Sequence, residues 1–384
     1  MFAKRTNWNL APNALAEALA KHRAAGKPLI DLTVSNPTEC GFTYESEVIL
    51  DALRNAAALL YEPNARGLQV AREAVVRYYA DRGDRVAVDD IILTTSTSEA
   101  YSWVFRLLCD AGDEVLVPAP SYPLLGFLAD IQDVNLVRYP LFYDHGWHID
   151  MHELERAITL RTRAVVVVHP NNPTGNYCRN NEMQRLGQIC AERGLATIAD
   201  EVFLDFALDG VRRASFVGST EALTFTMSGI SKICGLPQMK VAWLVASGPA
   251  ALKSEALARL EVIADTYLSM NAPVQLALGA LLGTRHGFQA QLLQRVRANL
   301  AELDRQLAAG ALGERLEVEG GWYAVVLVPN GGGGQDFESE RLAADGVLVY
   351  PGHFYDFAGE RHVVISLLVC KADFTQGIKA LLLP

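Results

Sequence analysis

Short apolar runs alternate with amphipathic stretches through the first 250 residues. The runs resemble strands buried on both faces, because they are rich in apolar residues without polar alternation; they are IILTT (91–95), DEVLVPAP (113–120), RAVVVVHP (163–170) and LATIADEVF (195–203). Helical patterns follow the first three runs, in EAYSWVFRLL, in YPLLGFLADI and at 180–193. This alternation predicts an α/β fold, with a mostly parallel sheet and helices on both faces. Ligands of such sheets bind at the carboxyl ends of the strands.

The pattern changes after residue 250. Residues 250–308 look largely helical, with a long helix near 286–308. Three later runs, WYAVVLVP, GVLVYPG and HVVISLLV, predict strands of a second sheet, and NGGGG (330–334) predicts a linker. A chain of 384 residues is expected to form two domains. We predict a large domain over 45–265 and a small α+β domain built from 1–44 and 266–384.

Charge and composition narrow the function. The formal net charge of -10 argues against nucleic acid or an anionic membrane as a partner. None of the six cysteines forms a CxxC pair, which indicates a reducing compartment. The apolar runs are shorter than the ~20 residues that span a bilayer, and we expect a cytoplasmic protein. His148 and His152 have metal-ligand spacing but no further ligand nearby, so no metal site is predicted.

Five motifs follow apolar strands in a fixed order: TTSTSEA, PSYP, HPNNPTG, ADEVF and SGISK. Together with YEPNARG near residue 61, they resemble the class I/II aminotransferases, which are pyridoxal-phosphate (PLP) enzymes of fold type I. The resemblance covers almost the whole chain. One motif alone would be a weak signal, but the ordered set is specific. It implies that the chain binds PLP at the carboxyl ends of its strands.

Lys232 in SGISK matches the lysine that holds PLP covalently as a Schiff base. An amine that also moves protons must be neutral, so its pKa must lie well below the usual value of about 10.4. Asp200 matches the aspartate that pairs with the protonated pyridine nitrogen. Taken alone, Lys232 would be read as a surface lysine in a turn and Asp200 as a turn or N-cap residue; the surrounding motifs favour the catalytic reading.

Other motif residues match contacts to the cofactor. Asn172 is expected to donate to the ring hydroxyl, with Asn171 as its competitor in a stretch that is also rich in turn formers. Tyr122 in PSYP matches the aromatic residue that lies flat on the pyridine ring. Tyr61 resembles the tyrosine that reaches the neighbouring subunit's phosphate. The last match implies a homodimer with a shared active site.

A phosphate site is expected where TTSTSEA opens a helix. Thr97 and Ser98 lie there, and their backbone N–H groups and hydroxyls suit a phosphate dianion, although ordinary N-capping would use the same geometry. Ser231 and Lys240 match family positions that contact the phosphate from the lysine segment. Lys240 replaces the usual arginine, and therefore supplies charge without the planar fork. Phe203 replaces a frequent tyrosine and cannot donate a hydrogen bond to the ring oxygen.

The largest departure lies in HVVISLLV (362–369). In the family this strand carries the arginine that binds the substrate's α-carboxylate, but Val364 takes that place here. Arg361 is three residues away, which puts it on the opposite face of a regular strand. The other candidate cations are Arg5, Arg66 of the partner subunit and Lys371. The alternative is that the substrate presents no carboxylate in the usual way.

The sequence therefore predicts a PLP-dependent aminotransferase. It would move an amino group between an amino acid or amine donor and a 2-oxo acid. Other PLP chemistry on the same scaffold is the alternative, as a lyase, decarboxylase or racemase, since a fold does not fix a reaction. A PLP-binding regulator or an inactive relative is a third, non-enzymatic reading.

Overall fold

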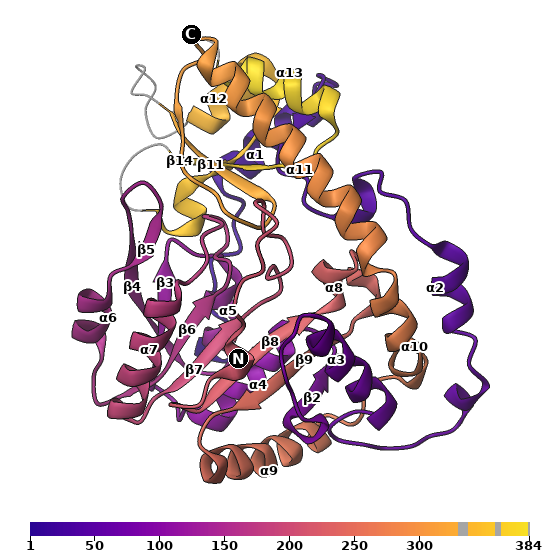
Figure 1. Cartoon of the computed structure of the whole chain (residues 1–384). Helices are drawn as coiled ribbons and strands as arrows, with labels where there is room; N and C mark the ends of the chain where they lie inside the picture. Colours follow the sequence, from indigo (N-terminus) through magenta and orange to yellow (C-terminus); the bar gives the residue numbers. More distant parts are fainter. Residues whose placement is uncertain (329–336, 358–361, 383–384) are drawn as a thin grey trace.

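The computed structural model describes residues 1–328, 337–357 and 362–382 (Figure 1). Its larger sheet has the strand order β2-β9-β8-β7-β6-β3-β4-β5. The strands are β2 (Ile91–Thr94), β3 (Glu114–Ala119), β4 (Asn135–Tyr143), β5 (Trp147–Ile149), β6 (Thr162–Val168), β7 (Ala196–Asp200), β8 (Thr224–Gly229) and β9 (Ala242–Ser247). Only β9 and β5 run antiparallel to their neighbours. The predicted α/β fold with a mostly parallel sheet is confirmed.

Helices cover both faces of this sheet, which explains the continuous apolar strands. They are α3 (Gln69–Asp81), α4 (Thr97–Leu108), α5 (Leu124–Ile131), α6 (Met151–Ala157), α7 (Asn180–Arg193), α9 (Ala250–Thr266) and α10 (Ala272–Gly283). Val166 of β6 packs in the core that includes α4, α5 and α9. Its neighbours Val165 and Val167 pack on the other face, in the core that includes α6 and α7. Successive residues of a strand point to opposite faces, so each must be apolar here.

The smaller sheet is antiparallel, with the order β10-β11-β14-β13. Its strands are β10 (Glu314–Arg315), β11 (Tyr323–Leu327), β13 (Tyr350–Pro351) and β14 (His362–Ser366). The helices near it are α1 (Ala14–Ala24), α11 (Arg285–Ala308), α12 (Phe337–Asp345) and α13 (Lys371–Leu381). In Figure 1, α11 runs from α10 up to the smaller sheet and so spans both parts of the molecule. The long helix and the strands predicted from the later apolar runs are therefore confirmed.

The two ends of the chain meet in the smaller part. β1 (Ile30–Asp31) pairs in parallel with β12 (Val347–Leu348). Between β1 and the larger sheet lie α2 (Ser46–Ala52) and two short 3-10 helices, η2 (Pro37–Glu39) and η3 (Ala56–Leu59). This pairing agrees with a small domain drawn from both termini, but the exact boundaries remain a prediction. The NGGGG segment lies outside the described residues.

Two apolar contacts join the smaller sheet to the larger one. Phe203, just after β7, meets Trp322 edge-on with ring centres 4.7 Å apart. On the opposite side, Val325 and Val364 belong to the same core as Trp147 of β5. The larger sheet therefore places its strand ends against the first residues of β11. Among the described helices, none combines the length and apolarity needed to cross a bilayer.

Candidate active site

The predicted motif residues follow the carboxyl ends of parallel strands in the larger sheet. Tyr122 follows β3, Asn172 follows β6, and Asp200 ends β7. Lys232 lies in α8 (Ile230–Ile233), directly after β8, and Thr97 begins α4 after β2. Because these strands run in the same direction, their carboxyl ends lie along one edge of the sheet. The fold thus gathers at one edge residues that are 135 positions apart in sequence, from Thr97 to Lys232.

Lys232 lies in a one-turn helix and not in the loop that its Ser- and Gly-containing surroundings suggest. Its Nζ is 4.9 Å from the centre of the Trp322 ring and 5.7 Å from that of Phe203. Burial lowers the pKa of Lys232, and the attraction of Asp200 opposes that shift. A half-buried amine under two aromatic rings loses solvation when charged. The environment therefore favours the neutral amine that proton transfer requires.

Asp200 is the buried acid of the site. Its side chain is 5% exposed, and burial raises its pKa to about 6. The backbone N–H of Val202 donates to Oδ1 at 3.1 Å, and the Tyr101 hydroxyl donates to Oδ2 at 3.2 Å. These two bonds fix the orientation of the carboxyl group without neutralising its charge. A cationic partner at this position would lower the pKa and stabilise the carboxylate.

The structure separates the two asparagines of HPNNPTG. Asn171 Nδ2 donates to the Pro120 carbonyl at 3.0 Å and to Thr174 Oγ1 at 2.7 Å, so Asn171 holds the turn together. The Oδ1 atoms of both asparagines are buried without a hydrogen-bond partner among the described residues, and the two residues differ at Nδ2, which is engaged in Asn171. A buried amide without a partner is unfavourable unless a ligand supplies one. Asn172 is therefore the better candidate for a ligand contact, in agreement with the spacing to PTG.

The first turn of α4 leaves two backbone N–H groups free of the helix cap. Ser96 caps the helix by accepting from the Glu99 N–H at 3.1 Å, and Glu99 in turn accepts from the Thr95 N–H at 2.6 Å. The cap thus uses Ser96 and leaves the N–H groups of Thr97 and Ser98 at the open helix end. The Ser98 side chain also lies close to the Tyr122 phenol, whose pKa is raised mainly by burial. The candidate phosphate contact and the candidate aromatic contact are therefore neighbours.

Ser231, Lys240 and Tyr61 are the remaining residues predicted to contact the phosphate. Lys240 is exposed and has a left-handed backbone (φ 55°) directly after the short helix η6 (Pro237–Met239). Ser231 is half-buried beside Lys232. Tyr61 is 74% exposed at the surface, and its loop is tied to the α9–α10 connection by the Asn64 N–H, which donates to Ser269 Oγ at 2.8 Å. The roles assigned to these three residues remain predictions.

Two site residues were missed in the sequence. Trp322 is fully buried over Lys232, and its Nε1 has no hydrogen bond among the described residues. Tyr101 orients Asp200 from one turn inside α4. The only sequence signal for Tyr101 is its position four residues after Thr97, which places both side chains on one helix face. Trp322 follows Gly320-Gly321 before a strand, which is a signal for a turn and not for a site.

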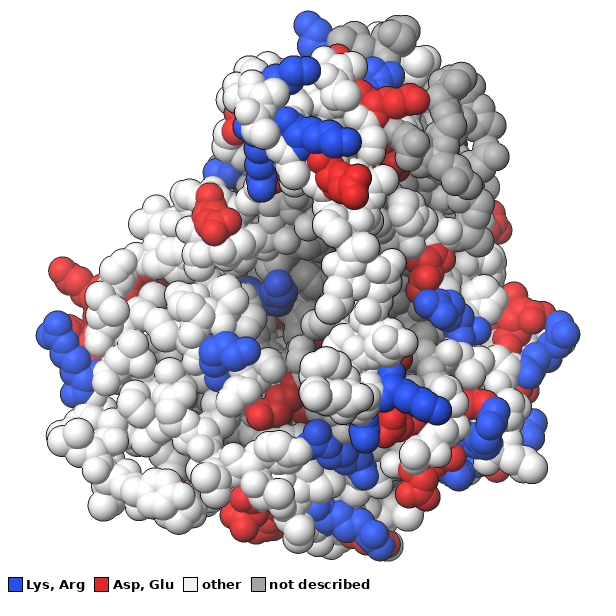
Figure 2. All heavy atoms as spheres, turned by 180° about the vertical axis from the view of Figure 1, so that it is seen from behind, with Lys and Arg blue, Asp and Glu red and all other residues white. Residues whose placement is uncertain are grey.

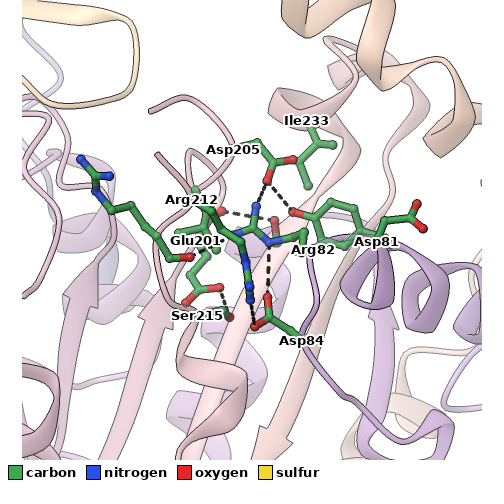
Figure 3. Close-up of polar contacts among 12 residues, drawn as sticks. Asp81, Arg82, Asp84, Glu201, Asp205, Arg212, Ser215 and Ile233 are labelled. Atoms are coloured by element: carbon green, nitrogen blue, oxygen red, sulfur yellow. Dashed lines mark hydrogen bonds and ion pairs between the residues drawn. The ribbon is translucent and has the colours of Figure 1, made fainter. Parts of the chain in front are cut away.

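A partly buried polar network lies next to the segment that carries Lys232 (Figure 3). The Arg82 guanidinium lies between Asp205 and Asp84 and forms an ion pair with each. Asp205 also accepts from Gln289 Nε2 at 3.0 Å, and the same Nε2 donates to the Ile233 carbonyl at 3.0 Å, one residue after the lysine. The network thus couples the segment after β7 to α8 and α11.

Glu201 anchors the opposite end of this region. Its carboxylate accepts from the Ser215 hydroxyl and from the Phe216 N–H, both at 2.6 Å. Burial raises the pKa of Glu201 to about 8. Because Glu201 and Asp200 are adjacent in the chain, they point to different sides of the sheet end. Glu201 therefore holds the scaffold while Asp200 faces the site.

The outer surface shows no concentration of one charge in the view of Figure 2. Blue and red residues are interspersed there, and the face is hollowed between the upper lobe and the broader lower body. Within the part of the chain that the structure describes, no group of three or more His, Cys, Asp or Glu side chains is placed to hold a metal ion.

Comparisons with known proteins agree with this geometry. Residues 27–367 match the family profile of aminotransferase class I and II. The chain is 31% identical to the glutamate-pyruvate aminotransferase AlaA of Escherichia coli K12 over 267 residues, 69% of this chain and 65% of that protein. It is 29% identical to an alanine aminotransferase of Mycobacterium bovis over 277 residues, 71% of this chain and 65% of the relative. The matched region thus spans just under two thirds of each relative.

The fold comparison extends over the whole chain. A crystal structure of alanine aminotransferase from Pyrococcus furiosus superposes with a TM-score of 0.89, covering 99% of this chain and 98% of that one at 23% sequence identity. At that identity the likeness supports the fold alone. Enzymes of the class I and II family typically use PLP. The family match over most of the sequence and the shared fold establish that this chain belongs to the class I and II aminotransferases.

Proposed function

We propose that the protein is a PLP-dependent aminotransferase that moves an amino group between an amino acid or amine donor and a 2-oxo acid. The observation that carries the proposal is that Lys232 and Asp200 lie close to each other at one edge of the sheet. Each lies within electrostatic range of the other, and burial shifts the pKa of both toward the neutral form. A buried acid and a buried amine with such shifts are typical of a catalytic site.

The described residues fit PLP. Asn172 Oδ1 is buried without a partner, and the open end of α4 at Thr97 and Ser98 suits a phosphate. Asp200 lacks a cationic partner of its own apart from Lys232, and a protonated ring nitrogen would provide one. When bound, PLP supplies an aldehyde for covalent attachment to an amine and an electron-poor ring that stabilises negative charge at the substrate's Cα.

Lys232 would perform the proton transfers. As a neutral amine, its Nζ can take the proton from the donor's Cα and return it on the cofactor side. Asp200 would hold a proton on the ring nitrogen by its negative charge, and Tyr101 keeps that carboxylate oriented. Phe203 and Trp322 lie over the amine and would limit its contact with water. Transamination needs such shielding because water would compete for the proton and for the reactive carbon.

A homodimer would complete the site. Leu59, Leu60 and Tyr61 are 93%, 67% and 74% exposed, and Leu268 is 69% exposed nearby on the α9–α10 connection. The Asn64–Ser269 hydrogen bond places these two segments side by side. Exposed apolar side chains that gather in one region favour a protein interface. Measuring the mass of the protein in solution by light scattering tests the dimer, and Leu60→Glu should reduce the dimer fraction.

The relatives indicate the first substrates to test. Their names refer to glutamate–pyruvate and alanine transamination, so L-alanine and L-glutamate are the donors to try with pyruvate and 2-oxoglutarate. Purified protein should be yellow from bound PLP. A suitable amino donor should convert its absorption spectrum to that of the pyridoxamine form. Transfer of the amino group to the 2-oxo acid would establish the function. The proposal fails if no donor in a broad panel changes the spectrum of the loaded enzyme.

A PLP lyase is the second candidate, and Val364 is the observation that favours it. Val364 stands where the family resemblance places the carboxylate-binding arginine, and its side chain is fully buried. A site that binds the substrate differently can direct the reaction toward elimination. Release of ammonia and pyruvate in the absence of any 2-oxo acid acceptor would identify the lyase. Transamination instead requires the acceptor for more than one turnover.

A further inference from the structure

A buried valine, Val364, stands on the smaller sheet where the family resemblance predicts an arginine. Val364 of β14 pairs with Val325 of β11 on one side and with Tyr350 of β13 on the other. Residues paired in this way project from the same face of a sheet. Val364 is completely buried in the core that also contains Trp147. The position therefore contributes shape and not charge.

Uncharged side chains that can donate hydrogen bonds lie near Val364. Tyr323 begins β11 two residues before Val325, and so projects from the same face. Burial raises the pKa of Tyr323, and its phenol lies close to the Ser35 side chain, just before η2. The neighbouring Trp322 carries a buried Nε1 that has no partner with good geometry among the described residues, although it lies close to the Tyr323 phenol. We call Ser35, Trp322 and Tyr323 the neutral cradle.

The cradle lies next to the reacting amine. The Trp322 ring is 4.9 Å from Lys232 Nζ, and the Tyr323 phenol lies close to the side chains of both Trp322 and Ser35. Phe203 packs edge-on against Trp322 and closes the other side. A substrate whose nitrogen reaches Lys232 would therefore place the group on its Cα within reach of the cradle. All three cradle residues can donate a hydrogen bond, and none carries a charge at neutral pH.

The described cations proposed from the sequence are engaged or exposed elsewhere. Arg66 of this chain forms an ion pair with Glu261 at 2.7 Å, and Arg5 forms one with Asp133 at 2.5 Å. Lys371 is exposed at the start of α13. Arg361 lies outside the described residues. Among the described residues, Asp200 is the only charged group that shifts the pKa of Lys232.

The uncharged donors of the neutral cradle should distinguish carboxylates from uncharged oxygen groups less strongly than an arginine does. A bidentate arginine strongly favours a carboxylate over a neutral group of the same shape. A neutral donor bonds an ionised oxygen more strongly than an uncharged one, but a carboxylate also costs more to remove from water. The two effects oppose each other. A neutral cradle should therefore accept charged and uncharged oxygen groups with similar affinity.

We propose that the neutral cradle binds the α-oxygen group of the substrate in place of arginine, and that the substrate class extends to primary amines with an uncharged α-oxygen group, such as α-amino amides and amino alcohols. This inference rests on the proposed PLP-dependent function, because it assumes that the donor's nitrogen is directed to Lys232. It adds a specificity-determining role for Tyr323, Trp322 and Ser35. It also predicts that a 2-oxo acid remains an acceptable partner.

Binding of two unreactive analogues tests the proposal. 2-Aminoisobutyric acid and its amide have the same shape and no proton on Cα, so they bind without turnover. Titration calorimetry with the PLP-loaded enzyme gives both dissociation constants. We expect them to agree within about tenfold, and we expect Tyr323→Phe to weaken binding of the amide by about three- to tenfold. Tyr139→Phe is the matched control, because it removes a buried phenol that donates to the Val166 carbonyl at 2.8 Å in the larger sheet.

Several results would overturn the proposal. They are a preference for the acid of more than tenfold, no binding of either analogue, or Tyr323→Phe binding the amide as well as the control does. An acid preference that disappears in Arg361→Gln would assign the carboxylate to that arginine. Trp322→Phe provides a second variant if Tyr323→Phe does not fold, and it should weaken the amide in the same range. Because no turnover is measured, failure here is distinct from failure to transfer an amino group.

Discussion

The two sides of the candidate active site differ in how closely they follow the family. On the larger sheet, Lys232, Asp200 and Asn172 occupy the ends of adjacent parallel strands, where the motifs place them. On the smaller sheet, Val364 is buried among apolar residues, and Tyr323 and Trp322 are proposed to act as neutral donors instead of a cation. In the proposed site, cofactor chemistry and substrate recognition would thus be carried by different sheets of this fold. The residues of one sheet could then change while those of the other are retained.

The largest expected effect concerns the lysine on the larger sheet. Lys232→Ala should reduce amino transfer by at least about a thousandfold, because it removes both the covalent attachment and the proton carrier. Borohydride reduction followed by mass spectrometry should find no cofactor linked to the variant. Lys253→Ala is a control, since Lys253 pairs with Asp90 away from the strand ends. Retained turnover in Lys232→Ala would remove the basis for the proposed function.

Replacing Asp200, on the same sheet, should reduce turnover nearly as much. Asp200→Asn keeps the shape of the side chain but loses the negative charge that would keep the ring nitrogen protonated. We expect turnover to fall by roughly a hundred- to ten-thousandfold while PLP stays bound. Stopped-flow absorbance with L-alanine or another active donor measures the step directly. A loss below tenfold would mean that Asp200 does not act on the cofactor.

The substrate side can be challenged by restoring the missing arginine. Val364→Arg would place a charge between Val325 and Tyr350, in a core built from apolar side chains. The free energy of unfolding should decrease by more than about 3 kcal/mol, since a buried unpaired charge is strongly unfavourable. Denaturant unfolding measures the change, with Val364→Ala as the size control. If the variant is as stable as the wild type and binds acids more tightly, this side of the site has kept the arginine geometry of the family.

The acid also gives a prediction for the protein without PLP. Because the folded-state pKa of Asp200 is raised to about 6 by burial, the folded protein holds its proton more tightly than the unfolded chain. Asp200 therefore destabilises the fold increasingly as pH rises from near 4 to near 6. Asp200→Asn should stabilise the PLP-free protein at pH 8 by on the order of 2–3 kcal/mol. Thermal unfolding at pH 4 and pH 8 tests this, and an equal difference at both values would contradict it.

The smallest expected effect concerns the phosphate end. Lys240→Arg supplies the planar fork that most relatives are expected to have and should tighten PLP binding by up to about fivefold. Lys240→Gln should weaken binding by about tenfold, because it removes one charge from an exposed phosphate contact. Equilibrium dialysis with PLP measures both constants. If neither change alters the affinity, Lys240 does not contact the phosphate.

The sequence by itself determined the layers of the fold and the place of the motif residues in it. β-Branched apolar runs without polar alternation indicate strands covered on both faces, and short motifs that directly follow parallel strands lie at their carboxyl ends. The positions of Lys232, Asp200 and Asn172 were therefore predictable, because each lies within a few residues of the strand that positions it, while their roles toward the cofactor are implied by the family resemblance. The choice of Asn172 over Asn171 followed from spacing and agrees with their different hydrogen bonds.

Only the tertiary structure decided which residues surround those motifs. Trp322 is 90 residues from Lys232 and meets it because the smaller sheet packs on the strand ends. The Ser35–Tyr323 contact and the Gln289–Ile233 hydrogen bond likewise join distant segments, and no local pattern encodes such contacts. Local periodicity fixes which face of an element is buried. What that face touches depends on how all the elements pack together, and here that packing buries Val364 where the family resemblance predicts a cation and brings Trp322 over Lys232.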